Sequence, residues 1–299
     1  MPADSLARRL LKRLLFPLVN ERTYQLAQAI AKAWDIRRGN WTEPELQLIP
    51  FAVDSGESVL DIGANYGLYT YHLSRAVTPS GKVYAFEPIP FTYETCQLVG
   101  KLLRFKQTEI FPKGCSDHTG RVAFTLPVQR SGSISAGQVH IAGRNDERNG
   151  KDIYSPFDRT LEMWCDVVAV DEFLPELSNL SLIKSDIEGA DLLALRGASR
   201  TIERNHPTVI CEIKNWFLDG FGIRPDEFGE FFFNKGYGMF HYDILGGHGI
   251  LQPVTLGALG MCGSDNYVFV HESRRDRFAP LLKNGASGRV FVTVSSQSS

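Results

Sequence analysis

The sequence predicts an α/β fold with a mostly parallel β-sheet and helices on both faces of the sheet. Short apolar runs at residues 58–62, 83–86 and 182–186 have the length and the bounding residues that are typical of strands. Between them, residues 68–76 and 91–103 carry apolar side chains at helical spacing. This alternation is typical of βαβ units, which build parallel sheets.

The composition is that of an ordinary globular protein. The chain has 299 residues, 43% of them hydrophobic, which is enough for one large core. The formal net charge is −2, whereas nucleic-acid binders usually carry a basic excess, so we expect no nucleic-acid partner. The five cysteines are scattered and form no C-x-x-C pair, which argues against a disulfide framework or a zinc site. A reducing, cytoplasmic location fits this cysteine usage best.

We divide the chain into an N-terminal helical extension at residues 1–50, a main domain at residues 51–275 and a C-terminal tail at residues 276–299. Residues 5–18 predict a basic amphipathic helix, with leucines at helical spacing and four basic residues between them. Such a helix lies on an anionic membrane surface, or packs on its own domain or on a second subunit of a homo-oligomer. We favour packing, because surface helices commonly carry such stripes. A second helix is expected at about residues 24–34.

The strand–helix rhythm breaks between residues 120 and 165. Residues 122–126 predict one arm of a hairpin, and residues 131–151 are polar and rich in Gly, Ser, Asn and Arg. A loop of this length within a compact domain is usually functional or mobile. We interpret it as part of an acceptor-binding region or a lid, or else as a disordered insertion, and the sequence favours neither interpretation.

A glycine-rich turn follows the first predicted strand and is the strongest local signal. Asp61 precedes Gly63 and Gly67, which have G-x-x-x-G spacing and not the G-x-G-x-x-G that cradles a pyrophosphate. A carboxylate at Asp61 would repel a pyrophosphate but suits a cationic ligand. S-adenosylmethionine has an ammonium, a sulfonium and no phosphate, so it matches this turn.

Glu87 ends the second predicted strand, 26 residues after Asp61. An acid in this place binds ribose hydroxyls in Rossmann-like folds, and one carboxylate accepts from both hydroxyls of a ribose. Glu87 as a surface acid or as a helix cap ahead of Phe91 is the alternative. Its position after the glycine-rich turn favours the ribose.

Three sequence blocks together resemble the FkbM-type methyltransferases. They are Val59 to Gly67, Ala85 to Pro88, and Ile183 to Asp191 with the following Leu195-Arg196-Gly197-Ala198. The resemblance covers most of residues 55–213. It implies a Rossmann-like class I methyltransferase fold, with a seven-stranded sheet and one antiparallel strand near its edge. It also implies S-adenosylmethionine as cofactor and O-methylation of sugars, polyketides or similar small natural products.

The resemblance also implies which residues bind the cofactor. Glu87 would hold the ribose, and Ser116-Asp117 would lie beside the adenine, although residues 117–120 also have the composition of a plain turn. The methionine end would be lined by the residues of the glycine-rich turn: Asp61, Gly63, Asn65 and Gly67.

Asp186 and Glu188 end the fourth strand of the domain and are the expected catalytic residues. They should face the crevice at the carboxyl edge of the sheet. Asp186 is expected to act as a base or to orient the acceptor, or else to hold the cofactor's ammonium. Glu188 acts beside it or caps the next helix. Glu212, which ends the fifth strand, is a further candidate for an acceptor contact.

The two acids do not by themselves indicate a metal. Some oxygen methyltransferases use magnesium to deprotonate the acceptor, but the i, i+2 spacing of Asp186 and Glu188 is insufficient evidence, and we expect no metal site.

The sequence thus predicts an S-adenosylmethionine-dependent methyltransferase that O-methylates a small-molecule or glycan acceptor. Amino-group methylators of nucleobases often carry N-P-P-Y or D-P-P-Y, whereas Asp186 is followed by Ile187-Glu188-Gly189. The alternatives are an NAD(P)-dependent oxidoreductase, which the missing G-x-G-x-x-G disfavours, and a non-catalytic S-adenosylmethionine-binding module. A sugar, a lipid-linked glycan, a polyketide and a peptide all stay open as acceptors.

Overall fold

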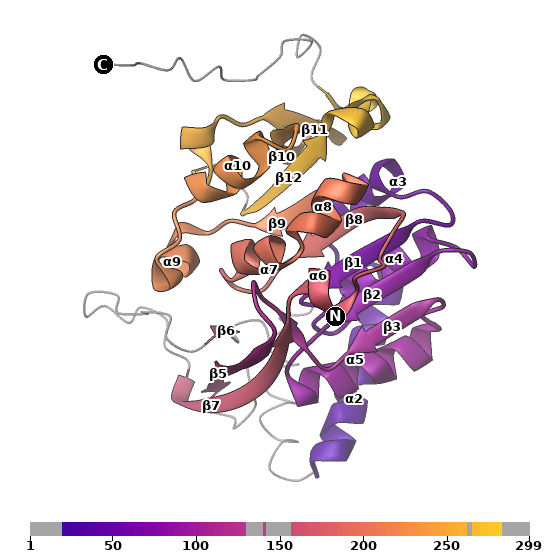
Figure 1. Ribbon diagram of the computed structural model, residues 1–299. Coiled ribbons are helices and arrows are strands. Elements are labelled where there is room, and N and C mark those ends of the chain that lie inside the picture. Colours follow the sequence, from indigo (N-terminus) through magenta and orange to yellow (C-terminus); the bar gives the residue numbers. More distant parts are fainter. Residues whose placement is uncertain (1–19, 130–139, 142–156, 262–264, 283–299) are drawn as a thin grey trace.

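The structure is a computed structural model that describes residues 20–129, 140–141, 157–261 and 265–282 (Figure 1). The helix predicted at residues 5–18 therefore lies outside the described residues. The same holds for the C-terminal tail beyond residue 282 and for the loop at residues 131–151, except for residues 140–141.

The main sheet of the described chain has eight strands in the order β11-β10-β12-β9-β8-β1-β2-β3. The five strands from β9 to β3 are parallel, β12 runs antiparallel to both β9 and β10, and β11 is antiparallel to β10. The predicted α/β class is confirmed, and the hairpin partner β11 adds one strand to the seven expected. The strands are β1 (Ser58–Ile62), β2 (Lys82–Phe86), β3 (Thr108–Phe111), β8 (Leu180–Ser185), β9 (Thr208–Glu212), β10 (Tyr237–Leu245), β11 (His248–Pro253) and β12 (Asn266–His271).

Successive side chains of a strand point to opposite faces of the sheet, and here both faces carry apolar side chains. Helices therefore cover both faces of this sheet. In β1, Leu60 and Ile62 join one core cluster and Val59 joins the other. The first cluster is covered by α6 (Val170–Phe173), α7 (Asp191–Gly197), α8 (Ser199–Asn205) and α10 (Asp226–Phe233). The opposite face is covered by η1 (Pro44–Leu48), α3 (Ile49–Ala52), α4 (Leu68–Ala76), α5 (Pro90–Leu103) and η5 (Glu272–Leu281). Short elements at α9 (Asn215–Leu218), η3 (Asp219–Phe221) and η4 (Leu256–Ala258) complete the described chain.

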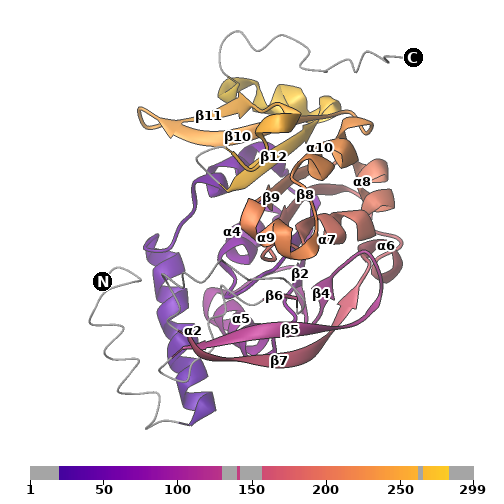
Figure 2. The ribbon, with the colours of Figure 1, turned by 90° about the vertical axis from the view of Figure 1, so that its left-hand side faces the viewer.

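A second, four-stranded sheet lies beside the main one (Figures 1 and 2). Its strands, in spatial order, are β4 (Gly114–Cys115), β7 (Phe157–Val168), β5 (Gly120–Gln129) and β6 (His140–Ile141). The predicted hairpin arm at residues 122–126 is the centre of β5. Strand β3 ends at Phe111 and does not continue to Cys115. Pro112 follows β3 without an N–H to donate, and Cys115 pairs with β7.

Helix α2 (Glu21–Arg38) is longer than the expected helix at residues 24–34. The Asn20 side chain accepts from the Thr23 N–H at its start, and Gly39 ends it in the left-handed conformation, with φ 69°. The helix packs along α5 (Figure 2). No helix in the described part of the chain is long and apolar enough to cross a membrane. The domain boundaries at residues 50 and 275 stay predictions.

We expect Gly197→Ala to destabilise the fold, because Gly197 brings α7 against the backbone of the second sheet. An added Cβ would lie 2.0 Å from the Ser116 carbonyl oxygen and 3.2 Å from the Ala169 Cα. Such overpacking lowers the free energy of unfolding by about 1–3 kcal/mol, which urea denaturation measures. Gly257→Ala is the control, since no atom lies within 4 Å of its added Cβ. An equal loss in the control contradicts the explanation.

Candidate functional site

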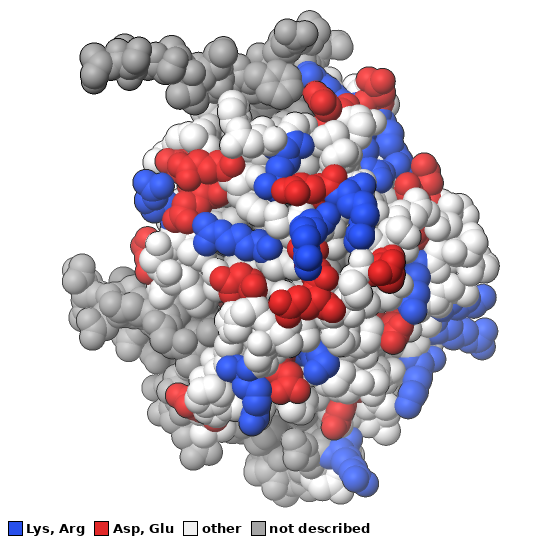
Figure 3. All heavy atoms as spheres, in the orientation of Figure 1, with Lys and Arg blue, Asp and Glu red and all other residues white. Residues whose placement is uncertain are grey.

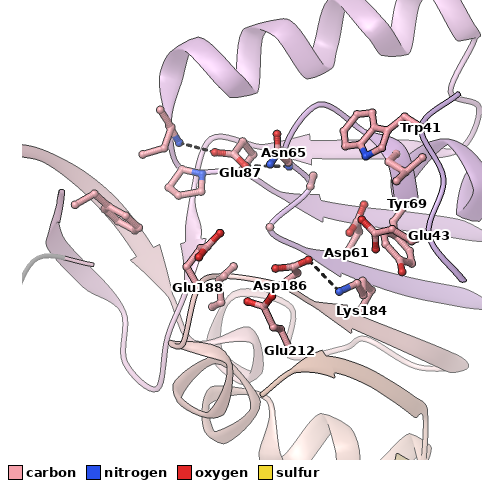
Figure 4. A pocket seen from close by; sticks show the side chains of 17 residues that line it. Trp41, Glu43, Asp61, Asn65, Tyr69, Glu87, Lys184, Asp186, Glu188 and Glu212 are labelled. Atoms are coloured by element: carbon pink, nitrogen blue, oxygen red, sulfur yellow. Dashed lines mark hydrogen bonds and ion pairs between the residues drawn. The ribbon is translucent and has the colours of Figure 1, made fainter. Parts of the chain in front are cut away.

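A cavity of about 240 Å³ opens where β1, β2, β8 and β9 end (Figure 4). The carboxyl ends of parallel strands are the usual ligand site of such sheets. Its lining residues come from these strand ends, from α4, from β5 and from the segment after α2: Trp41, Glu43, Asp61, Gly63, Ala64, Asn65, Leu68, Tyr69, Glu87, Pro88, Ile89, Phe124, Lys184, Asp186, Ile187, Glu188 and Glu212.

Asp61 is buried at the end of β1 and lines the cavity as predicted. It points to the side of the sheet that α4 covers, where the Thr70 hydroxyl donates to its carboxylate. On the neighbouring strand β8, Lys184 lies opposite it in register. Burial raises the pKa of Asp61 to about 6, although Thr70 and Lys184 both favour its charged form.

The two glycines of the turn, Gly63 and Gly67, allow close packing of neighbouring protein segments. Gly63 has φ 84°, and a Cβ there would lie 2.2 Å from the Asp186 carbonyl oxygen. The loop after β8 therefore requires this glycine. Gly67, with φ 88°, is not among the lining residues, and a Cβ there would press on Phe105 and Cys96. A side chain at residue 67 would therefore obstruct the packing of α4.

Glu87 is held in one orientation at the end of β2. One carboxylate oxygen accepts from the Asn65 N–H and the other from the Ile89 N–H, both at 3.0 Å. The residue is 6% exposed, so the alternative of a surface acid is wrong. Burial raises its pKa to about 7, against these two hydrogen bonds.

The geometry at Glu87 fits a ribose. Each of its carboxylate oxygens can accept a further hydrogen bond in addition to the one from the backbone N–H. The residue also lines the cavity. The buried Oδ1 atom of Asn65 lacks a hydrogen-bond partner in the described chain. A ligand with donor groups would satisfy these acceptors.

Lys184 is a site residue that the sequence interpretation missed. Its side chain is 1% exposed, and its Nζ lies 3.3 Å from Asp186 Oδ2 and 4.9 Å from the Tyr69 ring centroid. Burial alone would lower the pKa of Lys184, but Asp186 and Glu43 outweigh it and hold the pKa above its usual value. The ammonium is therefore charged.

Asp186 and Glu188, the expected catalytic residues, both line the cavity. The Asp186 N–H donates to the Ile62 carbonyl, which fixes this loop on β1, and its side chain is 36% exposed. Glu188 adopts φ 58°, an uncommon conformation for this residue type. It does not cap the next helix, because α7 begins after Ala190 with no side-chain capping bond. Asp191, the first residue of α7, accepts from the Gly189 N–H and from the Ser185 hydroxyl.

Glu212 and Glu43 complete the acidic lining. Glu212 ends β9, as expected, and one of its oxygens pairs with Lys214. Burial and Asp186 raise its pKa to about 8. Glu43 comes from the segment after α2, together with Trp41, and burial raises its pKa. No local sequence pattern marks Trp41 and Glu43, because only the folding of α2 onto α5 brings the segment after α2 here.

The predicted adenine residues lie outside the cavity lining. Ser116 is buried after β4, and Asp117 binds the Ser116 hydroxyl and the His118 ring at 3.2 and 2.7 Å. This arrangement matches the plain turn that was the alternative for residues 117–120. Phe124 of β5, which the sequence interpretation did not single out, lines this side of the cavity instead.

The described residues give no support for a metal site. The described residues contain no group of three or more His, Cys, Asp or Glu side chains placed to hold a metal ion. The expectation of no metal site stays a prediction.

Comparison with known proteins identifies the family. The family model described as the methyltransferase FkbM domain matches residues 61–239. Methyltransferase 1 of Beauveria bassiana (strain ARSEF 2860) is 29% identical over 155 residues, which cover 50% of this chain and 60% of that protein. Methyltransferase sdnD of Sordaria araneosa is 26% identical over 193 residues, covering 57% of this chain and 70% of that protein.

Among solved structures, the methyltransferase FkbM of Methylobacillus flagellatus KT is 16% identical, with a TM-score of 0.43. The match covers 88% of this chain and 59% of that one. At this score the likeness bears on neither fold nor function. The chain thus spans about 60% of the length of the Beauveria protein and of the Methylobacillus chain.

The match to the family model extends over more than half of the sequence and includes every residue of the cavity except Trp41 and Glu43. It implies S-adenosylmethionine as the cofactor, in agreement with the expectation from Asp61 and Glu87. The chain belongs to the methyltransferase FkbM domain family.

Proposed function

We propose that this protein transfers the methyl group of S-adenosylmethionine to a hydroxyl oxygen of a small-molecule or glycan acceptor. The observation that carries the proposal is the pairing of two carboxylate sets in one cavity. Asp61 and Glu87 end β1 and β2, while Asp186 and Glu188 follow β8. The first set suits the cofactor and the second set suits an acceptor.

The cofactor half consists of buried groups. Asp61 and Asn65 would hold the methionine end, and Glu87 would accept from the ribose hydroxyls. Bound S-adenosylmethionine supplies an activated methyl group on a sulfonium. The protein's own task is then to align the acceptor, to exclude water and to accept a proton. Alignment alone contributes up to about 7–11 kcal/mol of barrier reduction.

Asp186 is the residue best suited to the acceptor proton. Its carboxylate is partly exposed and lines the cavity. The Lys184 Nζ lies 3.3 Å from Asp186 Oδ2 and fixes the orientation of the carboxylate. A base positioned in this way contributes about 10²–10⁴ in rate. Ile187 and Phe124 provide apolar walls that help to exclude water.

Three observations favour this function over its alternatives. The acidic lining around Asp61 and Glu87 disfavours the pyrophosphate of a nicotinamide dinucleotide. Asp186, held by Lys184 in the same cavity, disfavours a module that binds the cofactor without catalysis. The loop Asp186-Ile187-Glu188-Gly189 lacks the N-P-P-Y motif, which favours oxygen over exocyclic nitrogen as the methylated atom.

S-adenosylhomocysteine should raise the melting temperature of the protein, and NAD should not. At about 100 times its dissociation constant, a ligand stabilises the fold by about 2.7 kcal/mol. Glu87→Ala should abolish the shift, because the ribose loses its acceptor. The exposed Glu176→Gln is the control. A shift with NAD that exceeds the one with S-adenosylhomocysteine refutes the assignment.

Asp186→Asn should lower kcat by about 10²–10⁴ while the dissociation constant of S-adenosylhomocysteine stays nearly unchanged. The amide keeps the shape of the side chain but accepts no proton. Single-turnover methyl transfer and calorimetry measure the two quantities. A parallel loss of cofactor affinity would instead assign Asp186 to the cofactor's ammonium.

Affinity for S-adenosylhomocysteine should weaken on acidification. Burial raises the pKa of Glu87 to about 7 and that of Asp61 to about 6, and the ribose and the ammonium require the ionised carboxylates. Above about pH 7 both are ionised. As the pH falls through 7 and then 6, binding must displace protons, and each group weakens affinity by up to about tenfold per pH unit.

Calorimetry between about pH 8 and pH 5 measures this dependence. Glu87→Gln should remove the component near pH 7 and keep the one near pH 6, which belongs to Asp61. An affinity that rises on acidification has the wrong sign and contradicts the assignment.

A further inference from the structure

We infer that Glu43 and Glu212 form an acceptor subsite that selects a hydroxyl compound bearing a protonated amine, such as an amino sugar. The inference rests on the proposed methyl transfer and specifies its substrate class. It is drawn from the charge of the cavity, from two buried carboxylate oxygens that lack donors, and from the positions of both residues around Asp186 (Figure 4).

The cavity is lined mostly by carboxyl groups, which give it a surplus of negative charge when they are ionised. Among its described lining residues, Lys184 is the only basic side chain, and it already contacts Asp186. A site lined by one sign of charge attracts the opposite sign and rejects its own. Phosphorylated and carboxylated acceptors are therefore disfavoured. The carboxylates of the lining are Glu43, Asp61, Glu87, Asp186, Glu188 and Glu212.

Glu212 offers the clearest vacant acceptor. The residue is 8% exposed, and Lys214 engages its Oε1. Its Oε2 is buried and has no hydrogen-bond donor in the described chain. Leaving a buried acceptor without a donor is costly, and more so for a charged group. A cationic N–H donor from a ligand in the cavity would remove this cost.

Glu43 repeats this situation from another element. Its Oε2 is likewise buried and lacks a partner among the described groups, although Lys184 and the Tyr69 hydroxyl favour the charged form of this carboxylate. Burial raises the pKa of both glutamates, and the nearby Asp186 carboxylate adds to the shift in each. Figure 4 shows both side chains near the Asp186–Lys184 pair, with Glu43 coming from the segment after α2 and Glu212 from the end of β9.

The class of ligand follows from this chemistry. Carboxylates only accept hydrogen bonds, and an ammonium offers three donors together with a positive charge. The Trp41 ring beside Glu43 gives an apolar surface for the body of the ligand (Figure 4). An amine held by Glu43 or Glu212 would leave Asp186 available for the hydroxyl that is methylated.

The test compares three probes of similar size, namely glucosamine, glucose and glucuronate, at neutral pH, where a bound ammonium favours the ionised form of both glutamates despite their raised pKa values. Calorimetry gives their dissociation constants for the protein saturated with S-adenosylhomocysteine. Glucosamine should bind about tenfold more tightly than glucose, because a hydrogen bond to a charged group contributes about 1.5–3 kcal/mol. Glucuronate should bind most weakly.

Glu43→Gln and Glu212→Gln test whether these carboxylates cause the preference. Each keeps the shape of the side chain, and the double variant should bind glucosamine and glucose with nearly equal affinity. Glu176→Gln, far from the cavity lining, should keep the wild-type preference. The affinity for S-adenosylhomocysteine should be unchanged in all of these variants.

Three results overturn the inference. The first is that the wild type shows no preference for glucosamine. The second is that the preference survives in the double variant. The third is a loss of S-adenosylhomocysteine affinity in that variant, which assigns the glutamates to the cofactor. Failure of the wild type to bind S-adenosylhomocysteine contradicts the proposed function itself. The titration with S-adenosylhomocysteine that precedes the sugar titrations detects this failure separately.

Discussion

The buried ammonium of Lys184 is the interaction on which the cavity depends. Taking several carboxylates out of water raises the free energy of their charged forms, and each needs donors or a nearby cation. Lys184 lies opposite Asp61 in the sheet and contacts Asp186 at the end of its own strand. The Tyr69 ring packs near the ammonium. Without this charge, the pKa values of Asp61 and Glu43 would be raised further.

The remaining acids divide into two regions with different chemistry. Glu87 has both oxygens anchored by backbone N–H groups, so its orientation is fixed before a ligand arrives. Glu43 and Glu212 each keep a buried oxygen without a donor in the described chain. The first arrangement suits a cofactor that is always the same. The second leaves carboxylate oxygens free to accept hydrogen bonds from a methyl acceptor. The acceptor is the ligand that differs among methyltransferases that share one fold.

The strand alternation allowed much of this site to be predicted. Asp61, Glu87 and Asp186 were identified because each lies at the end of a short apolar strand. The carboxyl ends of parallel strands meet at one edge of the sheet. Lys184 was missed, although a lysine in an otherwise apolar strand two residues before Asp186 points to the same face. Its burial was the missing information, since a lysine is almost never buried without a partner.

Other residues had no local signal. Trp41 and Glu43 precede the first strand, and only the packing of α2 on α5 carries the segment after it to the cavity. The second sheet depends on pairing between β5 and β7, which are separated by a polar stretch. The hydrophobic periodicity of a sequence indicates local structure and does not show which distant strands pair. Ser116 and Asp117 follow β4, because Cys115 joins this sheet and not β3, and their place beside the adenine stays a prediction.

A crystal structure with S-adenosylhomocysteine tests the central claim most directly, which is that this cavity was built for an adenosyl-sulfur ligand. We predict that both ribose hydroxyls lie about 2.6–3.2 Å from the Glu87 carboxylate oxygens, with the homocysteine end near Asp61 and Asn65. Electron density for the ligand at another place, with the Glu87 carboxylate buried and untouched, would contradict the account.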